Sequence, residues 1–233
     1  MSPSSSKTTR TLIRSDLDRS MVLRRNNIVL LITLVLLLFF VPVIPGKDTL
    51  LTSLLLGVLV VSGLFAADFI KIAFRILATF GSLVLIGLFL GQVFPESREL
   101  SIITFLLITL FFVVVTIALV AHVSTAREVD GATLLAAINS YLLIGITLSI
   151  LFMILDLFVP ASFSQLNPDN ADFSVFVYYG LVTLSTLGYG DITPDTALAR
   201  SRSTFTALLG QLYLVIIMAI IIGKYLKRRQ DTE

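Results

Sequence analysis

The chain has 233 residues, of which 56% are hydrophobic and only 14% are charged. Soluble domains are about 25% charged, so this composition predicts an integral membrane protein. The absence of cysteine excludes disulfides and thiolate metal sites. With one histidine and no HExxH, GxSxG or phosphate-binding glycine motif, we expect neither an enzyme nor a cofactor.

Six apolar segments follow one another, each near or above the length of roughly 20 residues that spans about 30 Å of hydrocarbon. They are Ile28–Ile44, Leu50–Ala67, Ile76–Phe94, Ile102–Val120, Thr133–Val159 and Phe205–Leu226. We expect prolines 42 and 45 to end the first span, followed by a tight turn over residues 45–48. Polar links are expected at Asp68–Arg75, His122–Gly131 and Pro160–Ala171.

The segment Met1–Asn27 precedes the first span and carries six basic residues. Its scattered apolar side chains fit either a short helix lying on an anionic membrane surface or a disordered tail. A cleaved signal peptide is disfavoured, because the apolar run that follows is long and has no small-residue cleavage site after it.

Between the fifth and sixth spans lies a stretch that is too short to cross the membrane. We expect Asp172–Ser185 to be a re-entrant helix, with Asp172 as its N-cap. The sequence Thr183-Leu-Ser-Thr-Leu-Gly-Tyr-Gly-Asp191 overlaps its end. Glycine on both sides of one tyrosine permits an unusual extended backbone, which can turn successive carbonyl oxygens to one side. A row of carbonyl oxygens suits a dehydrated cation.

The pattern Thr-x-x-Thr-x-Gly-Tyr-Gly-Asp resembles the selectivity filter of potassium channels, and the flanking segments extend the resemblance over about residues 133–229. With six spans, the chain resembles a prokaryotic-type six-transmembrane channel. Leu187 departs from the family, which most often has valine there. The resemblance implies backbone or hydroxyl ligands for K⁺ at Thr186, Leu187, Gly188 and Tyr189, together with a filter carbonyl from Gly190.

The resemblance also implies a packed cuff around the filter, into which the Tyr189 side chain points away from the ion. Tyr178 and Tyr179 fall where the family places cuff aromatics, although aromatic residues at the membrane interface are the alternative. Val182 stands where the family often has a glutamate that pairs with Asp191. We therefore expect a tyrosine hydroxyl, first of all that of Tyr179, to bond Asp191. The residues expected to support the filter are Thr183, Tyr178, Tyr179, Val182 and Asp191.

The sixth span is expected to line the inner cavity. Gly210 lies about where the family has a gating hinge, but a helix glycine also permits close packing, and the sequence leaves both readings open. Ile216, Ile220 and Gly223 recur at helical intervals. They form a candidate apolar gate that would close by dewetting.

The first four spans resemble a voltage sensor without its charges, because Ser101–Ala121 contains no basic residue. We expect little or no intrinsic voltage sensitivity, since there is no charge to move. Asn139 is a candidate for an interhelical hydrogen bond. The expected division is a cytoplasmic N-terminal segment over 1–27, a four-helix domain over 28–125, a pore domain over 126–229 and a short tail over 230–233.

Basic residues set the expected orientation. With both termini cytoplasmic, 13 of the 17 basic residues lie inside and the filter faces outward. The resulting prediction is a multi-pass protein of the cell membrane that passes K⁺ passively. Its partners would be membrane lipids, K⁺ as the permeant ion and three further copies of itself, with no nucleic acid. A non-selective cation channel or a silent modulatory subunit is the alternative.

Overall fold

The computed structural model describes residues 3–41, 49–66, 71–126, 129–164 and 172–230. Seven helices lie within these ranges: α1 (Pro3–Phe40), α2 (Thr49–Ala66), α3 (Lys71–Val93), α4 (Arg98–Thr125), α5 (Gly131–Phe158), α6 (Phe173–Leu184) and α7 (Ala197–Gln230). No strand occurs in the described ranges apart from one isolated bridge between Phe163 and Pro194. The all-α fold class is confirmed.

Apart from α2, the spanning helices are longer than the apolar segments that predicted them. Lys71 and Arg75 begin α3, and His122 lies in the last turn of α4, so the expected polar links Asp68–Arg75 and His122–Gly131 are partly wrong. Helices extend into polar sequence because capping side chains satisfy their first amides. Ser97 caps α4 in this way, and Asp130 caps α5. The expected turn over 45–48 and its prolines lie outside the described residues.

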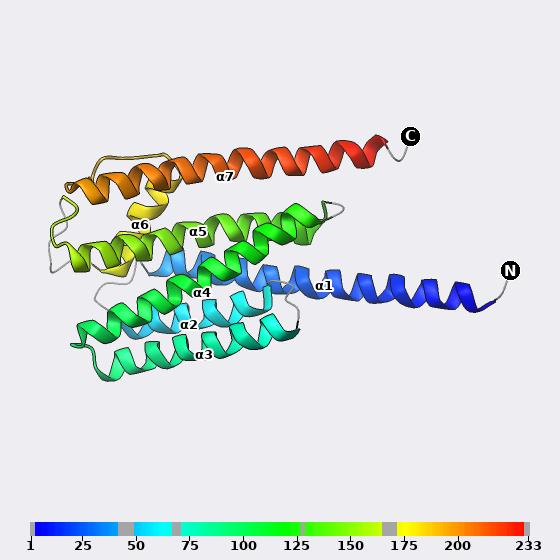
Figure 1. The fold of residues 1–233 in the computed structure, drawn as a ribbon, viewed down its shortest axis with the longest axis horizontal. Coiled ribbons are helices and arrows are strands. Elements are labelled where there is room, and N and C mark those ends of the chain that lie inside the picture. Colours follow the sequence, from blue (N-terminus) through cyan, green and yellow to red (C-terminus); the bar gives the residue numbers. More distant parts are fainter. Residues whose placement is uncertain (1–2, 42–48, 67–70, 127–128, 165–171, 231–233) are drawn as a thin grey trace.

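The N-terminal segment differs from both readings of the sequence. It is neither a separate surface helix nor a disordered tail, because α1 runs without a break from Pro3 to Phe40. Figure 1 shows its first half projecting beyond the other helices. The part of α1 with spanning character is Met21–Phe40.

Five helices of the described chain are long and apolar enough to cross a membrane, within α1, α3, α4, α5 and α7. The remaining expected span is the second, which is α2; this helix has 18 residues, and its apolar stretch Leu50–Ala66 falls just short. At 1.5 Å per residue its length is about 27 Å, close to the hydrocarbon thickness. It lies alongside α1 and α3, so it occupies the same layer as these helices (Figure 1).

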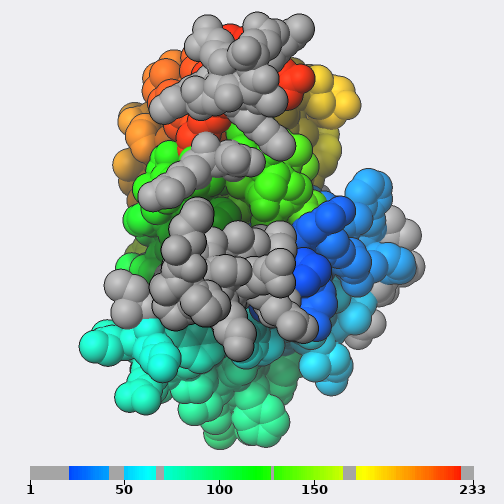
Figure 2. Space-filling model, turned by 90° about the vertical axis from the view of Figure 1, so that its right-hand side faces the viewer, coloured from blue at the N-terminus to red at the C-terminus, as the bar shows by residue number. Residues whose placement is uncertain are grey.

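The helices form three layers. Seen from the end where α1 begins and α7 ends, α7 lies on one side, α4 and α5 lie in the middle, and α1 to α3 lie on the other side (Figure 2). The core between the layers is apolar and includes Phe111, Phe112 and Leu143, all fully buried. α5 is the central element, because it contacts α1, α4, α6 and α7.

One polar contact ties α5 to α1 inside this apolar core. The Asn139 side-chain amide donates to the backbone oxygen of Asn27 at 2.9 Å and to its side-chain oxygen at 3.0 Å. Asn27 in turn donates to the last carbonyl of α2, Ala66 O, at 2.9 Å. The expected interhelical hydrogen bond of Asn139 is confirmed.

Candidate functional site

The short helix α6 enters the bundle from the end opposite to the two termini. Figure 1 shows that the chain returns to that same end before α7 begins, so α6 and the residues after it form a re-entrant loop. Asp172 is the N-cap, because its carboxylate accepts from the Val175 amide at 3.2 Å. The Ser174 hydroxyl donates to the same oxygen at 2.5 Å. The expected cap is confirmed.

Two glycines let α6 approach α5 closely. A Cβ atom on Gly180 would overlap the Ser149 side chain of α5, and one on Gly145 of α5 would press into Leu181. Both glycines are buried. The backbone of α6 is therefore held against α5 at a distance that no larger residue would allow.

An aromatic cluster fixes α6 from the other direction. The centroid of the Tyr179 ring lies 5.0 Å from those of Phe152 in α5 and Phe163 in the loop after α5, in edge-to-face arrangements. Its hydroxyl lies 2.6 Å from the Ser203 hydroxyl of α7. Tyr179 is 6% exposed, so its side chain packs within its own chain.

The residues expected to form the filter, Thr186–Gly190, are called the filter below, and their backbone alternates in the sign of φ. Thr186, Gly188 and Gly190 have φ angles of 58°, 54° and 79°, whereas Leu187 and Tyr189 between them do not have positive φ. A backbone that alternates in this way can point successive amides to one side. Glycine takes the left-handed state at little cost, but Thr186 adopts it against its preference.

The amides of this stretch face α6. Thr186 N donates to Thr183 O at 3.0 Å, while Leu187 N and Gly188 N donate to Val182 O at 3.0 and 3.3 Å. These carbonyls belong to the last turn of α6, where a helix leaves its carbonyls without internal partners. In a trans peptide the carbonyl points opposite to the amide of the next residue. Because the amides of Thr186, Leu187 and Gly188 turn toward α6, the carbonyls of Ser185, Thr186 and Leu187 turn away from it.

A tyrosine hydroxyl does bond Asp191, but it belongs to Tyr178. The Tyr178 hydroxyl donates to Asp191 Oδ2 at 2.6 Å. The expectation that Tyr179 makes this bond is wrong, because successive residues of a helix point about 100° apart and Tyr179 turns into the core. The hydrogen bond from Tyr178 lowers the pKa of Asp191. The Tyr189 ring stacks on Tyr178 with centroids 6.5 Å apart and is 67% exposed within one chain.

The loop after α5 pairs with the residues that follow the filter, a feature that the sequence did not reveal. Ser164 N donates to Thr193 O at 2.8 Å, and Asp195 N donates to Ser162 O at 2.9 Å. The hydroxyls of Ser164 and Thr193 lie 2.6 Å apart. Serine and threonine in loops give too general a signal to predict this pairing across about thirty residues.

Gly210 of α7 lies against the last residue of α6. A Cβ atom at position 210 would overlap the backbone oxygen of Leu184. This contact supports the close-packing reading of Gly210, and α7 continues through the position as an unbroken helix. Of the candidate gate residues, Ile216 and Gly223 are exposed within one chain, and Ile220 is half-buried. A single chain therefore does not form a constriction from these three residues.

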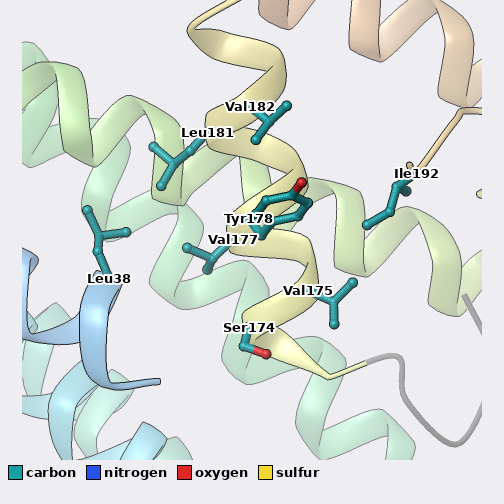
Figure 3. A pocket seen from close by; sticks show the side chains of 8 residues that line it. All are labelled: Leu38, Ser174, Val175, Val177, Tyr178, Leu181, Val182 and Ile192. Atoms are coloured by element: carbon teal, nitrogen blue, oxygen red, sulfur yellow. The ribbon is translucent and has the colours of Figure 1, made fainter. Parts of the chain in front are cut away.

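One face of α6 is left open within the single chain. Figure 3 shows a hollow there, lined by Leu38 at the end of α1, by Ile192 just after the filter and by side chains of α6 that include Tyr178 and Val182. The lining is almost entirely apolar. The open face lies next to the exposed filter residues Leu187 and Tyr189.

The comparisons with known proteins bear on this same region. Residues 140–227, from within α5 to near the end of α7, match a family model described as "Ion channel". The match supports an ion channel. It contains the whole re-entrant loop and covers well under half of the chain, leaving α1 to α4 outside. Neither the curated proteins nor the solved structures gave a match. The apolar helices and the family match together support a membrane protein.

Proposed function

We propose that this ion channel is selective for potassium and conducts passively as a homotetramer. The observation that carries the proposal is the filter backbone, in which Thr186, Gly188 and Gly190 alternate in φ with their neighbours while the amides bond to α6. This arrangement leaves a row of carbonyl oxygens on one side, which suits a cation that has shed its water. One chain would supply one quarter of the coordination shell.

The C-terminus of α6 adds to the attraction for a cation. A helix C-terminus carries about half a negative charge, and the re-entrant path directs it into the bundle. Some of its carbonyl oxygens accept hydrogen bonds from the filter amides, but the dipole of the helix remains. Four such helices around one axis would favour a cation near mid-membrane.

The open faces of the single chain support the tetramer. Leu187 is 55% exposed and Tyr189 is 67% exposed, although both belong to a stretch with fixed backbone. The hollow beside Tyr178 and Val182 is apolar and adjoins them (Figure 3). We propose that a neighbouring copy covers these surfaces and completes the cuff around the filter, with both termini in the cytoplasm and the filter outside.

The deciding experiment is a flux assay on purified protein in liposomes, comparing K⁺ with Na⁺ gradients. The test variant is Gly188→Ala, because an alanine there has open space but must adopt a φ of 54°. This conformation costs about 1–2 kcal/mol per chain, so four copies strain the filter severely. The matched control is Gly91→Ala in α3, where a Cβ also meets nothing and φ is not positive.

We expect K⁺ flux in the wild type and in Gly91→Ala, with little Na⁺ flux, and loss of K⁺ flux in Gly188→Ala. Equal K⁺ and Na⁺ flux would replace the proposal with a non-selective cation channel. Absence of flux from a protein that runs as a tetramer would favour a silent subunit.

A further inference from the structure

One lysine joins the end of α7 to the end of α4. The Lys224 ammonium donates to Val123 O at 2.7 Å and to Ser124 O at 2.8 Å. The two carbonyls lie a hundred residues away in sequence. These are the only hydrogen bonds between α4 and α7 that the described residues show, and the two helices otherwise touch far less than α4 touches α5.

The two carbonyls are good acceptors because of where α4 ends. The helix stops at Thr125, and the last carbonyls of a helix have no amide partners within it. His122 O accepts from the Ala126 amide at 2.9 Å, and Val123 O and Ser124 O accept from Lys224. A cation at a helix C-terminus also interacts favourably with the helix dipole. Bonds from a charged donor are about twice as strong as neutral ones.

A second polar contact holds α7 three turns before Lys224. The Tyr213 hydroxyl donates to Ala137 O of α5 at 2.7 Å and lies 2.5 Å from the Ser140 hydroxyl. Tyr213, Ile217 and Lys224 recur at intervals of four and seven, so they share the face of α7 that packs on its own bundle. Ile217 is buried on this face.

The candidate gate lies between these two contacts. Ile216, Ile220 and Gly223 all fall between Tyr213 and Lys224 along α7. Tyr213 fixes the N-terminal end of this segment to α5 at Ala137 and Ser140, where the region that matches the channel family begins. Lys224 fixes the C-terminal end of this segment to α4, which lies outside the matched region.

We propose that Lys224 is a positioning residue that ties the inner end of α7 to the C-terminus of α4. The position of the α1–α4 bundle then sets the position of the segment from Ile216 to Gly223. The bundle acts on the conduction path through this contact and needs no charges of its own within the membrane. The part of the proposal that concerns conduction rests on the proposed function; the anchor itself does not.

A distance measurement tests the anchor directly. The chain contains no cysteine, so two spin labels can be placed at Thr125→Cys in α4 and Tyr225→Cys in α7, both exposed positions. Labelled chains are diluted with unlabelled ones, and the distance distribution is read by pulsed electron paramagnetic resonance. The variants are Lys224→Gln, Lys224→Arg and, as a matched control, Lys71→Gln, which removes the same charge from an exposed site at the same end of the bundle.

We expect one narrow distance in the unmodified background, in Lys71→Gln and in Lys224→Arg, which retains a charged donor. We expect a broader and longer distribution in Lys224→Gln. A distribution in Lys224→Gln that matches the background would overturn the anchor.

The same variants are then compared for K⁺ flux in liposomes. Lys224→Gln should change the flux by about tenfold or more, since tenfold corresponds to losing one of its two charge-assisted hydrogen bonds. Lys224→Arg should keep the flux of the wild type. A loosened helix end with unchanged flux would overturn the coupling while leaving the anchor in place. If the wild type itself carries no flux, the proposed function fails, and the distance measurement alone decides whether the anchor exists.

Discussion

The Tyr178 hydroxyl lies 2.6 Å from Asp191 Oδ2 and joins the middle of α6 to the residue just after the filter. The bond closes a stretch of 14 residues, from Tyr178 to Asp191, that contains every proposed ion ligand. Its neighbour Tyr179 makes a different bond, to Ser203 of α7. Two adjacent tyrosines thus fix α6 to two different elements.

Replacement of Tyr178 by phenylalanine should weaken the end of the filter that lies next to Asp191. The change removes one hydrogen bond to a carboxylate and leaves the ring stacked on Tyr189. We expect K⁺ flux in liposomes to decline faster after its onset in Tyr178→Phe than in the wild type. Asp191→Asn removes the same charge-assisted bond from the other side and should produce a similar decline; wild-type behaviour in both variants would contradict the role of this bond.

The same bond predicts a pH dependence. Because it lowers the pKa of Asp191, its stabilising contribution is present above the ordinary carboxyl pKa and is lost as pH falls through the lowered value. The wild type should therefore retain flux to a lower pH than Tyr178→Phe, in which the pKa of Asp191 returns toward 3.8. Identical acid limits for the two proteins would show that Asp191 does not act through this bond.

Gly210→Ala should destabilise the pore region. The added methyl group would overlap Leu184 O at the end of α6, so α6 and α7 must separate. Overpacking of this kind costs about 1–3 kcal/mol. Thermal melting in detergent should show a clearly lower midpoint than for Gly91→Ala, which adds the same methyl group in open space. Equal melting of the two variants with altered flux in Gly210→Ala alone would favour a hinge.

Loss of the buried Asn139 amide should destabilise the contact between α1 and α5. Asn139→Ala removes two hydrogen bonds and leaves buried acceptors of Asn27 without this donor. An unsatisfied buried polar group costs about 1–3 kcal/mol. Denaturant titration in detergent measures this loss, and Ile138→Ala at the adjacent exposed position should cost much less. A smaller loss in Asn139→Ala than in Ile138→Ala would contradict the importance of the contact.

Conduction should be nearly independent of voltage. Residues 101–121 of α4 contain no basic side chain, and moving one charge through 100 mV is worth about 2.3 kcal/mol. Open probability in a planar bilayer should therefore change little between about −100 and +100 mV. A steep voltage dependence would show that a charge elsewhere in the chain moves across the field.

The sequence by itself determined the membrane class, the all-α fold and the place of the re-entrant helix. These follow from local properties: apolar runs of spanning length, an N-cap at Asp172 and two glycines around Tyr189. The helix ends were less predictable, because caps such as Ser97 and Asp130 carry helices beyond the apolar runs.

Only the tertiary structure decided which side chains meet. Tyr178 and Tyr179 are equivalent in sequence, and the rotation of α6 against α5 sends one to Asp191 and the other into the core. The same holds for Lys224, since no local pattern predicts a contact with carbonyls a hundred residues away. For Gly210 the sequence left a hinge and close packing equally open, and the contact with Leu184 favours close packing. Such pairings depend on how whole helices pack, and the sequence around each residue does not indicate which distant residue it will contact.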